Sequence, residues 1–256
     1  MLPGSTRYTA DYYEAVARKA ATSARAILPW MLELAAPGSV IDVGCGTGAW
    51  LSVCRELGVE DVRGYDGGWV PLDDLRFPHE RFVCVDLAGP AAESARADLA
   101  ICLEVAEHLP AEAADHLIAR LAGHASCVLF SASVPGQRGD HHVNEQWPAY
   151  WAERFARHGL HACDIVRPRF WEDPQVAWWY AQNAILYVGD DARLPDHAAD
   201  QLAPTRTTVP RSLVHPGMLA AVEAACVEEI ERQRAGTGNL VHLLGARLRQ
   251  TRMIRR

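Results

Sequence analysis

A glycine-rich turn near residue 45 carries the clearest chemical signal in the sequence. In the segment DVGCGTG, Asp42 precedes three glycines at alternating positions, Gly44, Gly46 and Gly48. Glycine lets the backbone turn sharply, and it lets a ligand approach the main chain without a clash with Cβ. Asp66 ends the next expected strand, where an acid can bind both hydroxyls of a ribose. The pattern therefore predicts a nucleotide-type binding turn.

The spacing of the glycines distinguishes between two classes of cofactor. Dinucleotide-binding turns follow the pattern GxGxxG, whereas the last glycine here comes one residue earlier. The carboxylates of Asp42 and Asp66 are poor neighbours for a pyrophosphate, but they suit a cationic sulfonium ligand without phosphate. The turn therefore favours a sulfonium cofactor over NAD.

A second group of chemically competent residues lies in the polar loop 135–147, which follows the fifth expected strand. His141 and His142 are candidate general bases, because an unperturbed histidine titrates near neutral pH. The alternative is that one of them caps the next helix and the other faces solvent. Asp140 and Glu145 add possible metal ligands, but the zinc-binding pattern HExxH is absent, and we expect no metal.

Four further side chains are candidates for contact with an organic acceptor. Aromatic rings beside polar amides can line the wall of such a site. The four are Asn144 and Trp147 in the loop, and Tyr180 and Gln182 in the aromatic segment WWYAQN. Core packing is the alternative for the aromatic segment.

Alternating strands and helices must position these residues. A helix is expected over 9–35, and short apolar runs predict strands that are buried on both faces. The expected strands are 40–43, 62–67, 81–89, 98–110 (running into a turn), 125–136, 161–168 and 178–189. This order predicts an α/β, Rossmann-like fold with a seven-stranded, mostly parallel sheet and helices on both faces. The last strand is expected to be antiparallel, because no convincing helix precedes it.

Together these motifs resemble the class I S-adenosylmethionine-dependent methyltransferases, whose first motif is an acid, any residue and three spaced glycines. The resemblance extends over roughly residues 8–190. It implies that Asp66 binds the ribose, that Asp86 contacts the adenine amino group, and that Glu104 belongs to the fourth-strand motif. The segment EVAEHLP is similar to the branch with the ubiquinone-biosynthesis O-methyltransferases, and residues 130–151 resemble bacterial small-molecule or glycan-associated methyltransferases.

The resemblance implies an enzyme with S-adenosylmethionine as cofactor. We expect it to methylate a small-molecule hydroxyl, of a sugar or a secondary metabolite, with a loop histidine as general base. An N-methyltransferase that holds a neutral amine and works by proximity is the alternative. A catalytically silent cofactor-binding protein is less favoured, because the glycine turn and the histidine-rich loop are both intact.

Composition sets limits on partners and location. The chain has 256 residues, 49% of them hydrophobic, and a net charge of -7, which disfavours disorder and nucleic-acid binding. No apolar run is long enough to span a membrane, and the first residues do not look like a signal peptide. The seven cysteines are dispersed without a CxxC pair, which is typical of reduced thiols in the cytoplasm.

The expected domain organisation is a methyltransferase domain over 1–190, with the helix 9–35 as a cover for cofactor or substrate. Residues 191–256 are expected to be a linker and a C-terminal helical extension. One amphipathic helix is expected at 217–233 and another after Gly238. The second has an apolar stripe of Leu240, Leu243, Leu244 and Leu248. Such a stripe needs a partner surface, and a homodimer contact through these helices is one possibility.

Overall fold

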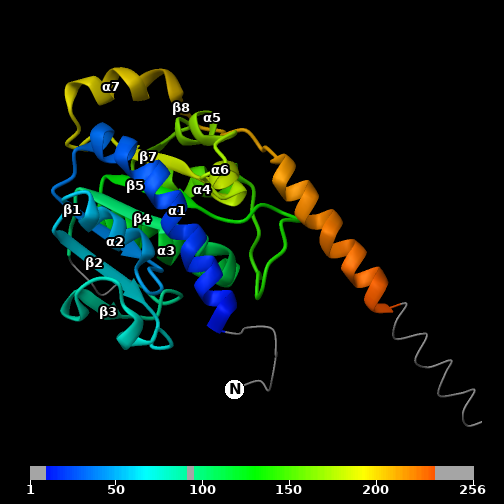
Figure 1. Ribbon diagram of the computed structural model, residues 1–256. Coiled ribbons are helices and arrows are strands. Elements are labelled where there is room, and N and C mark those ends of the chain that lie inside the picture. Colours follow the sequence, from blue (N-terminus) through cyan, green and yellow to red (C-terminus); the bar gives the residue numbers. More distant parts are fainter. Residues whose placement is uncertain (1–9, 91–94, 234–256) are drawn as a thin grey trace, which may run out of the picture. The chain divides into compact units, whose positions relative to one another are not determined.

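The computed structural model describes residues 10–90 and 95–233, with side chains from residue 17 onward (Figure 1). The chain divides into two compact units, residues 1–215 and 216–256. The first unit contains the sheet and all of the candidate site residues.

An eight-stranded mixed sheet forms the centre of the first unit, in the order β3-β2-β1-β4-β5-β7-β6-β8. Its strands are β1 (Ser39–Val43), β2 (Asp61–Asp66), β3 (Phe82–Cys84), β4 (Leu99–Leu103), β5 (Cys127–Ser131), β6 (Leu160–Cys163), β7 (Ile185–Gly189) and β8 (Arg206–Thr207). The strands from β3 to β5 are parallel, whereas β7 is antiparallel to both β5 and β6. The expected α/β fold and the antiparallel last strand are therefore confirmed. β8, which pairs antiparallel with β6, is an addition to the seven expected strands.

Helices cover both faces of the sheet, as expected. They are α1 (Ala10–Ala35), α2 (Ala49–Glu56), α3 (Ala114–His124), α4 (Pro148–Ala156), α5 (Val166–Phe170), α6 (Trp178–Asn183) and α7 (Asp196–Leu202). One hydrophobic cluster joins α1, α2, α5, α6 and α7 to one face of the sheet, and a second joins α3 and α4 to the other face.

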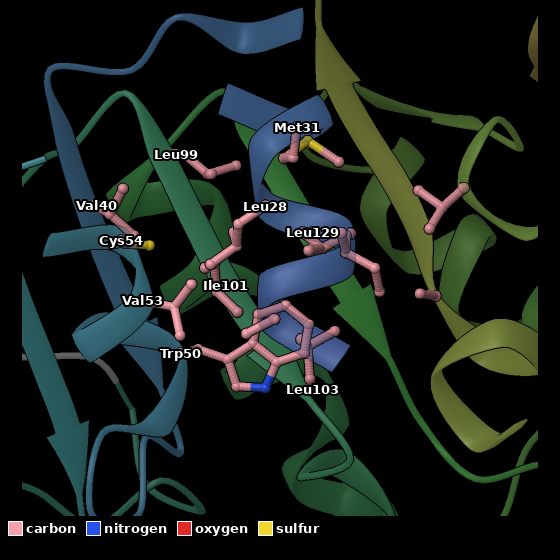
Figure 2. Close-up of a cluster of buried hydrophobic side chains, with 14 of the residues drawn as sticks. Leu28, Met31, Val40, Trp50, Val53, Cys54, Leu99, Ile101, Leu103 and Leu129 are labelled. Carbon is pink, nitrogen blue, oxygen red and sulfur yellow. The ribbon is translucent and has the colours of Figure 1, made fainter. Parts of the chain in front are cut away.

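The central strand β4 shows why the strands are continuous apolar runs. Leu99, Ile101 and Leu103 point into the first cluster, whereas Ala100 and Cys102 point into the second. Figure 2 shows the first cluster, in which β4 packs under side chains of α1 and α2. Because both faces are covered, no position on this strand needs to be polar.

The expected strand over 178–189 is wrong in its first half. Residues 178–183 form helix α6, and the strand begins only at Ile185. The N-terminal end of α6 is fixed by a contact from a distant part of the chain, since the N–H of Ala177 donates to Oγ of Ser23 at 2.9 Å. The sixth strand is also shorter than expected, because it ends at Cys163 and α5 follows.

Residues 191–215, expected to be the start of a linker, instead contain α7 and β8, and the first unit continues through His215. The described part of the second unit, residues 216–233, is helical, close to the expected helix 217–233. The helix expected after Gly238 lies outside the described residues. In the described part of the chain, no helix combines the length and apolar character needed to cross a bilayer.

Candidate functional site

The strand order reverses between β1 and β4, which lie side by side at the centre of the sheet. In open α/β sheets, ligands bind beyond the carboxyl ends of the strands at such a point. The glycine turn follows β1 and Glu104 follows β4. The topology therefore brings the predicted cofactor residues to one edge of the sheet.

The glycine turn is packed on one side and open at another. The N–H groups of Gly44 and Cys45 both donate to the carbonyl oxygen of Tyr65, at 2.7 and 3.2 Å. Gly44 has a φ of +82°, and a Cβ at this position would overlap the side chain of Val105. At Gly46, with a φ of +52°, a Cβ would have no heavy atom within 4 Å. This open space at Gly46 is what a ligand that approaches the main chain requires.

Gly48 has a different role from Gly46. Its φ is +84°, and a Cβ would overlap the ring of Phe77. The same ring also comes close to Gly64 on β2. Gly48 is therefore required for packing against Phe77, which the spacing of the glycines alone did not reveal.

Asp66 connects β2 to the turn. Its Oδ2 accepts the N–H of Gly46 and its Oδ1 accepts the N–H of Gly67, each at 2.7 Å. Burial raises the pKa of Asp66, although these two bonds and one from the Trp69 side chain oppose the shift. Each carboxylate oxygen has a second lone pair, so Asp66 can still accept hydrogen bonds from a ribose.

The other two predicted acids lie in contrasting environments. Asp42 is buried in β1, and burial, together with the charge of Asp66, raises its pKa to about 8. A bound cation would stabilise the ionised form of Asp42 and oppose this shift. Asp86 is exposed, and its Oδ1 accepts the N–H of Ala88 at 3.0 Å. Its contact with adenine stays a prediction.

Glu104 is the centre of a polar network at the end of β4. Its backbone has a φ of +55°, which is uncommon for a residue other than glycine, and its N–H donates to Ser131. Oε1 accepts Nδ2 of Asn183 and Oε2 accepts Nε2 of Gln137, both at 3.0 Å. The sequence identified Glu104, but it did not identify Asn183 or Gln137, because only the tertiary structure brings them to β4.

A second cluster lies beside this network. One carboxylate oxygen of Glu107 and one ring nitrogen from each of His108 and His142 lie within 4.8 Å of one another. Oε1 of the fully buried Glu107 accepts the Ser133 hydroxyl at 2.8 Å, and Oε2 has no hydrogen-bond partner among the described residues. Burial and the charge of Glu104 raise the pKa of Glu107. The segment EVAEHLP was the available signal for this cluster.

The two adjacent loop histidines lie in different environments. The side chain of His142 is 12% exposed, and its Nδ1–H donates to Oε1 of Glu145 at 3.0 Å. Glu145 also accepts two backbone N–H groups of the same loop, at 2.8 and 2.7 Å. His141 is 84% exposed, and Nε2 lies 3.2 Å from a carboxylate oxygen of Asp140. Of the two predicted bases, His142 alone is held in place by partly buried neighbours.

Asn144 and Trp147 remain candidates for contact with an acceptor. The N–H of Asn144 donates to the carbonyl oxygen of Glu107 at 3.1 Å, which ties the loop to the Glu107 cluster. The buried side-chain amide nitrogen of Asn144 has no partner among the described residues, so it can donate to a ligand. Trp147 is exposed at the start of α4.

The structure places Tyr180 and Gln182 on α6, where both side chains are buried. Tyr180 is buried edge-on against Trp50, with ring centroids 5.3 Å apart. Gln182 is fully buried, where its Nε2 donates to Oε1 of Gln137 at 3.1 Å and its Oε1 accepts the N–H of His215 at 2.7 Å. Both side chains therefore pack around the site, and their contact with an acceptor stays a prediction.

Residues 12–172, more than half of the chain, match a family described as "Methyltransferase domain". The chain belongs to this methyltransferase family. It is therefore an enzyme of this class, and the S-adenosylmethionine cofactor expected from the glycine turn is confirmed with it. The more specific resemblance to the ubiquinone-biosynthesis branch is not confirmed. No curated protein matches the sequence.

Solved structures of methyltransferases share the fold at low sequence identity. DesVI from Streptomyces venezuelae is 14% identical, over 70% of this chain and 95% of that one, with a TM-score of 0.52. The magnesium protoporphyrin IX methyltransferase (ChlM) from Synechocystis PCC 6803, with bound SAM, is 18% identical over 74% and 87%, with a TM-score of 0.51. The glycopeptide N-methyltransferase MtfA, complexed with SAM, is 14% identical over 73% and 100%, with a TM-score of 0.50.

The residues at the methyltransferase site fit its cationic cofactor. The open backbone at Gly46 provides room for a ligand. Burial raises the pKa of Asp42, Asp66 and Glu104, and a cationic ligand at this edge of the sheet would favour their ionised forms. In the described residues, no ion pair with a lysine or arginine neutralises these three acids. A sulfonium and an amino group can supply the missing positive charge.

Proposed function

We propose that this methyltransferase transfers the methyl group of S-adenosylmethionine to a hydroxyl of a small molecule. The observation that carries the proposal is the cluster of Glu107, His108 and His142. This cluster lies next to the glycine turn, because the side chain of the nearby Val105 packs against Gly44. A hydroxyl oxygen must lose its proton as the new C–O bond forms. A cluster of proton-accepting groups at this position, with the buried Glu107 among them, supports a hydroxyl acceptor.

The residues of the turn would hold the cofactor, which supplies a methyl carbon activated by a positively charged sulfur. The main chain from Gly44 to Gly48 would bind its amino-acid end, and Asp66 would bind its ribose. Alignment of the acceptor with the methyl group would contribute most of the acceleration. Asn144, with its free amide nitrogen, is the best supported contact for the acceptor.

His142 is the loop histidine that we propose for the chemistry. Its Nδ1 contacts Oε1 of Glu145, which holds the ring in place, and one of its ring nitrogens lies in the cluster with Glu107 and His108. His141 is exposed and its side chain contacts Asp140. The acceptor proton is therefore lost at the Glu107 cluster, and His141 contributes little.

The partner and the location follow from composition. A net charge of -7 supports a small molecule, rather than a nucleic acid, as the acceptor. All seven cysteines are free thiols, and five of them are buried, which supports the reducing cytoplasm as the location.

The test is product formation from S-adenosylmethionine with matched hydroxyl and amine acceptors, measured as S-adenosylhomocysteine and methylated product by mass spectrometry. We expect turnover with a hydroxyl acceptor and loss of turnover in His142→Ala. An amine-methylating enzyme that works by proximity would methylate the amine, and His142→Ala would leave its rate unchanged. A silent binding protein would bind the cofactor product in calorimetry and would turn over neither class.

A further inference from the structure

Glu107 has a buried carboxylate oxygen without a partner in the described residues. The residue is fully buried, Ser133 satisfies Oε1, and Oε2 is left without a hydrogen bond. The charge of the neighbouring Glu104 adds to the repulsion at this point. A buried, unsatisfied carboxylate oxygen is costly unless a cation or a donor binds it.

Two imidazole nitrogens lie close to the carboxylate of Glu107. One ligand atom from each of Glu107, His108 and His142 lies within 4.8 Å of the others. Ligands at about 2.1 Å from a tetrahedral ion are about 3.4 Å apart, so coordination requires the three ligand atoms to move closer by up to about 1.4 Å. The rings of His108 and His142 meet edge to face, with centroids 4.9 Å apart, so the two imidazoles are already neighbours.

His142 also has the outer contact that is typical of a metal-bound histidine. A carboxylate on the far ring nitrogen fixes the tautomer and directs the other nitrogen to the ion. Here the Nδ1–H of His142 donates to Oε1 of Glu145, and Glu145 is itself held by the N–H groups of Gly136 and Arg138. The loop is tied to the other two ligands, because the N–H groups of Val143 and Asn144 donate to the Glu107 carbonyl oxygen.

We propose that Glu107, His108 and His142 bind one divalent transition-metal ion, for which Zn²⁺ is the best fit. Two imidazoles and one carboxylate favour zinc or a similar ion over Mg²⁺, which prefers oxygen ligands. Three protein ligands leave a coordination position open, as in catalytic zinc sites. This inference differs from our expectation, from the sequence, that the protein binds no metal. That expectation was based on the possible ligands in residues 140–145 and did not include Glu107 and His108.

The open position suits the hydroxyl of the acceptor, and this second part rests on the proposed function. A metal-bound hydroxyl ionises far more readily than a free one. Its O–H bond breaks and the proton passes to solvent water. The oxygen electron pair then forms the bond to the methyl carbon, while the C–S bond breaks and its electrons return to sulfur. The products are the methyl ether, neutral S-adenosylhomocysteine and one released proton, and the metal is unchanged. His142 is then a ligand of the ion rather than a general base.

The test uses the full chain, freed of metal with a chelator and titrated with Zn²⁺ alone by calorimetry, and with Co²⁺ for the absorption spectrum. We expect one ion per chain in the wild type and at least a tenfold weaker affinity in Glu107→Gln, His108→Ala and His142→Ala. His158→Ala, which removes an exposed histidine after α4, is the matched control and should bind like the wild type. A Co²⁺ spectrum without thiolate bands excludes binding by the cysteines.

Zinc binding that is absent in the wild type, or equal in the His142→Ala and His158→Ala proteins, would overturn the site. Calorimetry with S-adenosylhomocysteine verifies that each variant is folded, and the exposed position of His108 makes its variant the least disruptive of the three. Because no acceptor is present, the metal result is independent of the proposed methylation. Loss of turnover with chelator and its return with Zn²⁺ support the second part, whereas turnover unaffected by chelator contradicts it.

Discussion

The N–H of Gly46 donates to Oδ2 of Asp66 at 2.7 Å, so that the glycine turn after β1 and the acid at the end of β2 form one unit. The second oxygen of Asp66 accepts the N–H of Gly67 at the same distance. The acid that is predicted to bind the ribose therefore also orders the backbone around the open position at Gly46. The predicted binding of the ribose and the local stability therefore involve the same carboxylate.

We expect Asp66→Ala to weaken S-adenosylhomocysteine binding by an order of magnitude or more, because two ribose hydroxyls lose a charged acceptor. The variant should also lose about 1–3 kcal/mol of stability, since two backbone N–H groups lose their partner. Calorimetry and thermal unfolding measure the two effects. Asp73→Ala, at an exposed position in the short helix Leu72–Asp74, is the control. Unchanged affinity in a folded Asp66→Ala protein would refute the assignment, and tight NAD binding would contradict the choice of a sulfonium cofactor.

Gly44→Ala should mainly reduce stability, whereas Gly46→Ala should mainly weaken binding of S-adenosylhomocysteine. Both positions require a positive φ, which costs alanine about 1–2 kcal/mol. A Cβ at Gly44 also overlaps Val105, so Gly44→Ala should lower the melting temperature more. A Cβ at Gly46 meets only open space, so Gly46→Ala should remain folded and bind S-adenosylhomocysteine more weakly. Equal losses of stability in the two variants would contradict the view that Gly44 is needed for packing and Gly46 for ligand binding.

His142→Ala should reduce turnover by about a hundredfold or more, the usual cost of losing a group that assists proton removal. His141→Ala should change turnover by no more than severalfold, because its side chain is exposed and lies beside Asp140. Affinity for S-adenosylhomocysteine should stay close to that of the wild type in both. Steady-state rates at saturating acceptor measure the difference. Equal losses of turnover in the two variants would contradict the different roles that we assign to His141 and His142.

The stability of the ligand-free protein should fall as the pH rises from about 4 to about 8. The folded-state pKa of Asp42 is raised from 3.8 to about 8 by burial and by Asp66, so in this range the folded state binds a proton that the unfolded state has lost. Stability then decreases by up to about 1.4 kcal/mol per pH unit. Asp42→Asn should flatten this part of the curve. An identical pH dependence of urea unfolding in wild type and Asp42→Asn would contradict the shift.

Truncation should separate the two compact units at His215 rather than at residue 190. A chain that ends at His215 keeps α7 and β8, and it should retain folding and S-adenosylhomocysteine binding. A chain that ends at Asp190 loses the β6–β8 pairing, and it should be less stable. Light scattering on the longer truncation tests the homodimer contact considered from the sequence, since a contact made by the C-terminal helices would be lost. A dimer that persists would place the contact on the first unit.

The sequence by itself determined the frame of the site. The glycine turn, Asp66 and Glu104 could be located because each follows a short apolar strand, and the carboxyl ends of parallel strands meet at one edge of a sheet. Spacing and charge then selected a cationic cofactor over a dinucleotide. These inferences succeeded because they depend on contacts that are local or that parallel topology enforces.

Only the tertiary structure decided how the side chains are distributed around that frame. His141 and His142 are equivalent in the sequence, but the contact with Glu145 and the packing against His108 hold only the second one in place. Tyr180 and Gln182 were expected on a strand, but a turn of helix anchored by Ser23 carries them into the core. The cluster of Glu107, His108 and His142 forms where a loop after β5 folds back on the end of β4. Such contacts depend on how loops run between distant segments of the chain. The local hydrophobic periodicity of the sequence does not indicate these loop paths.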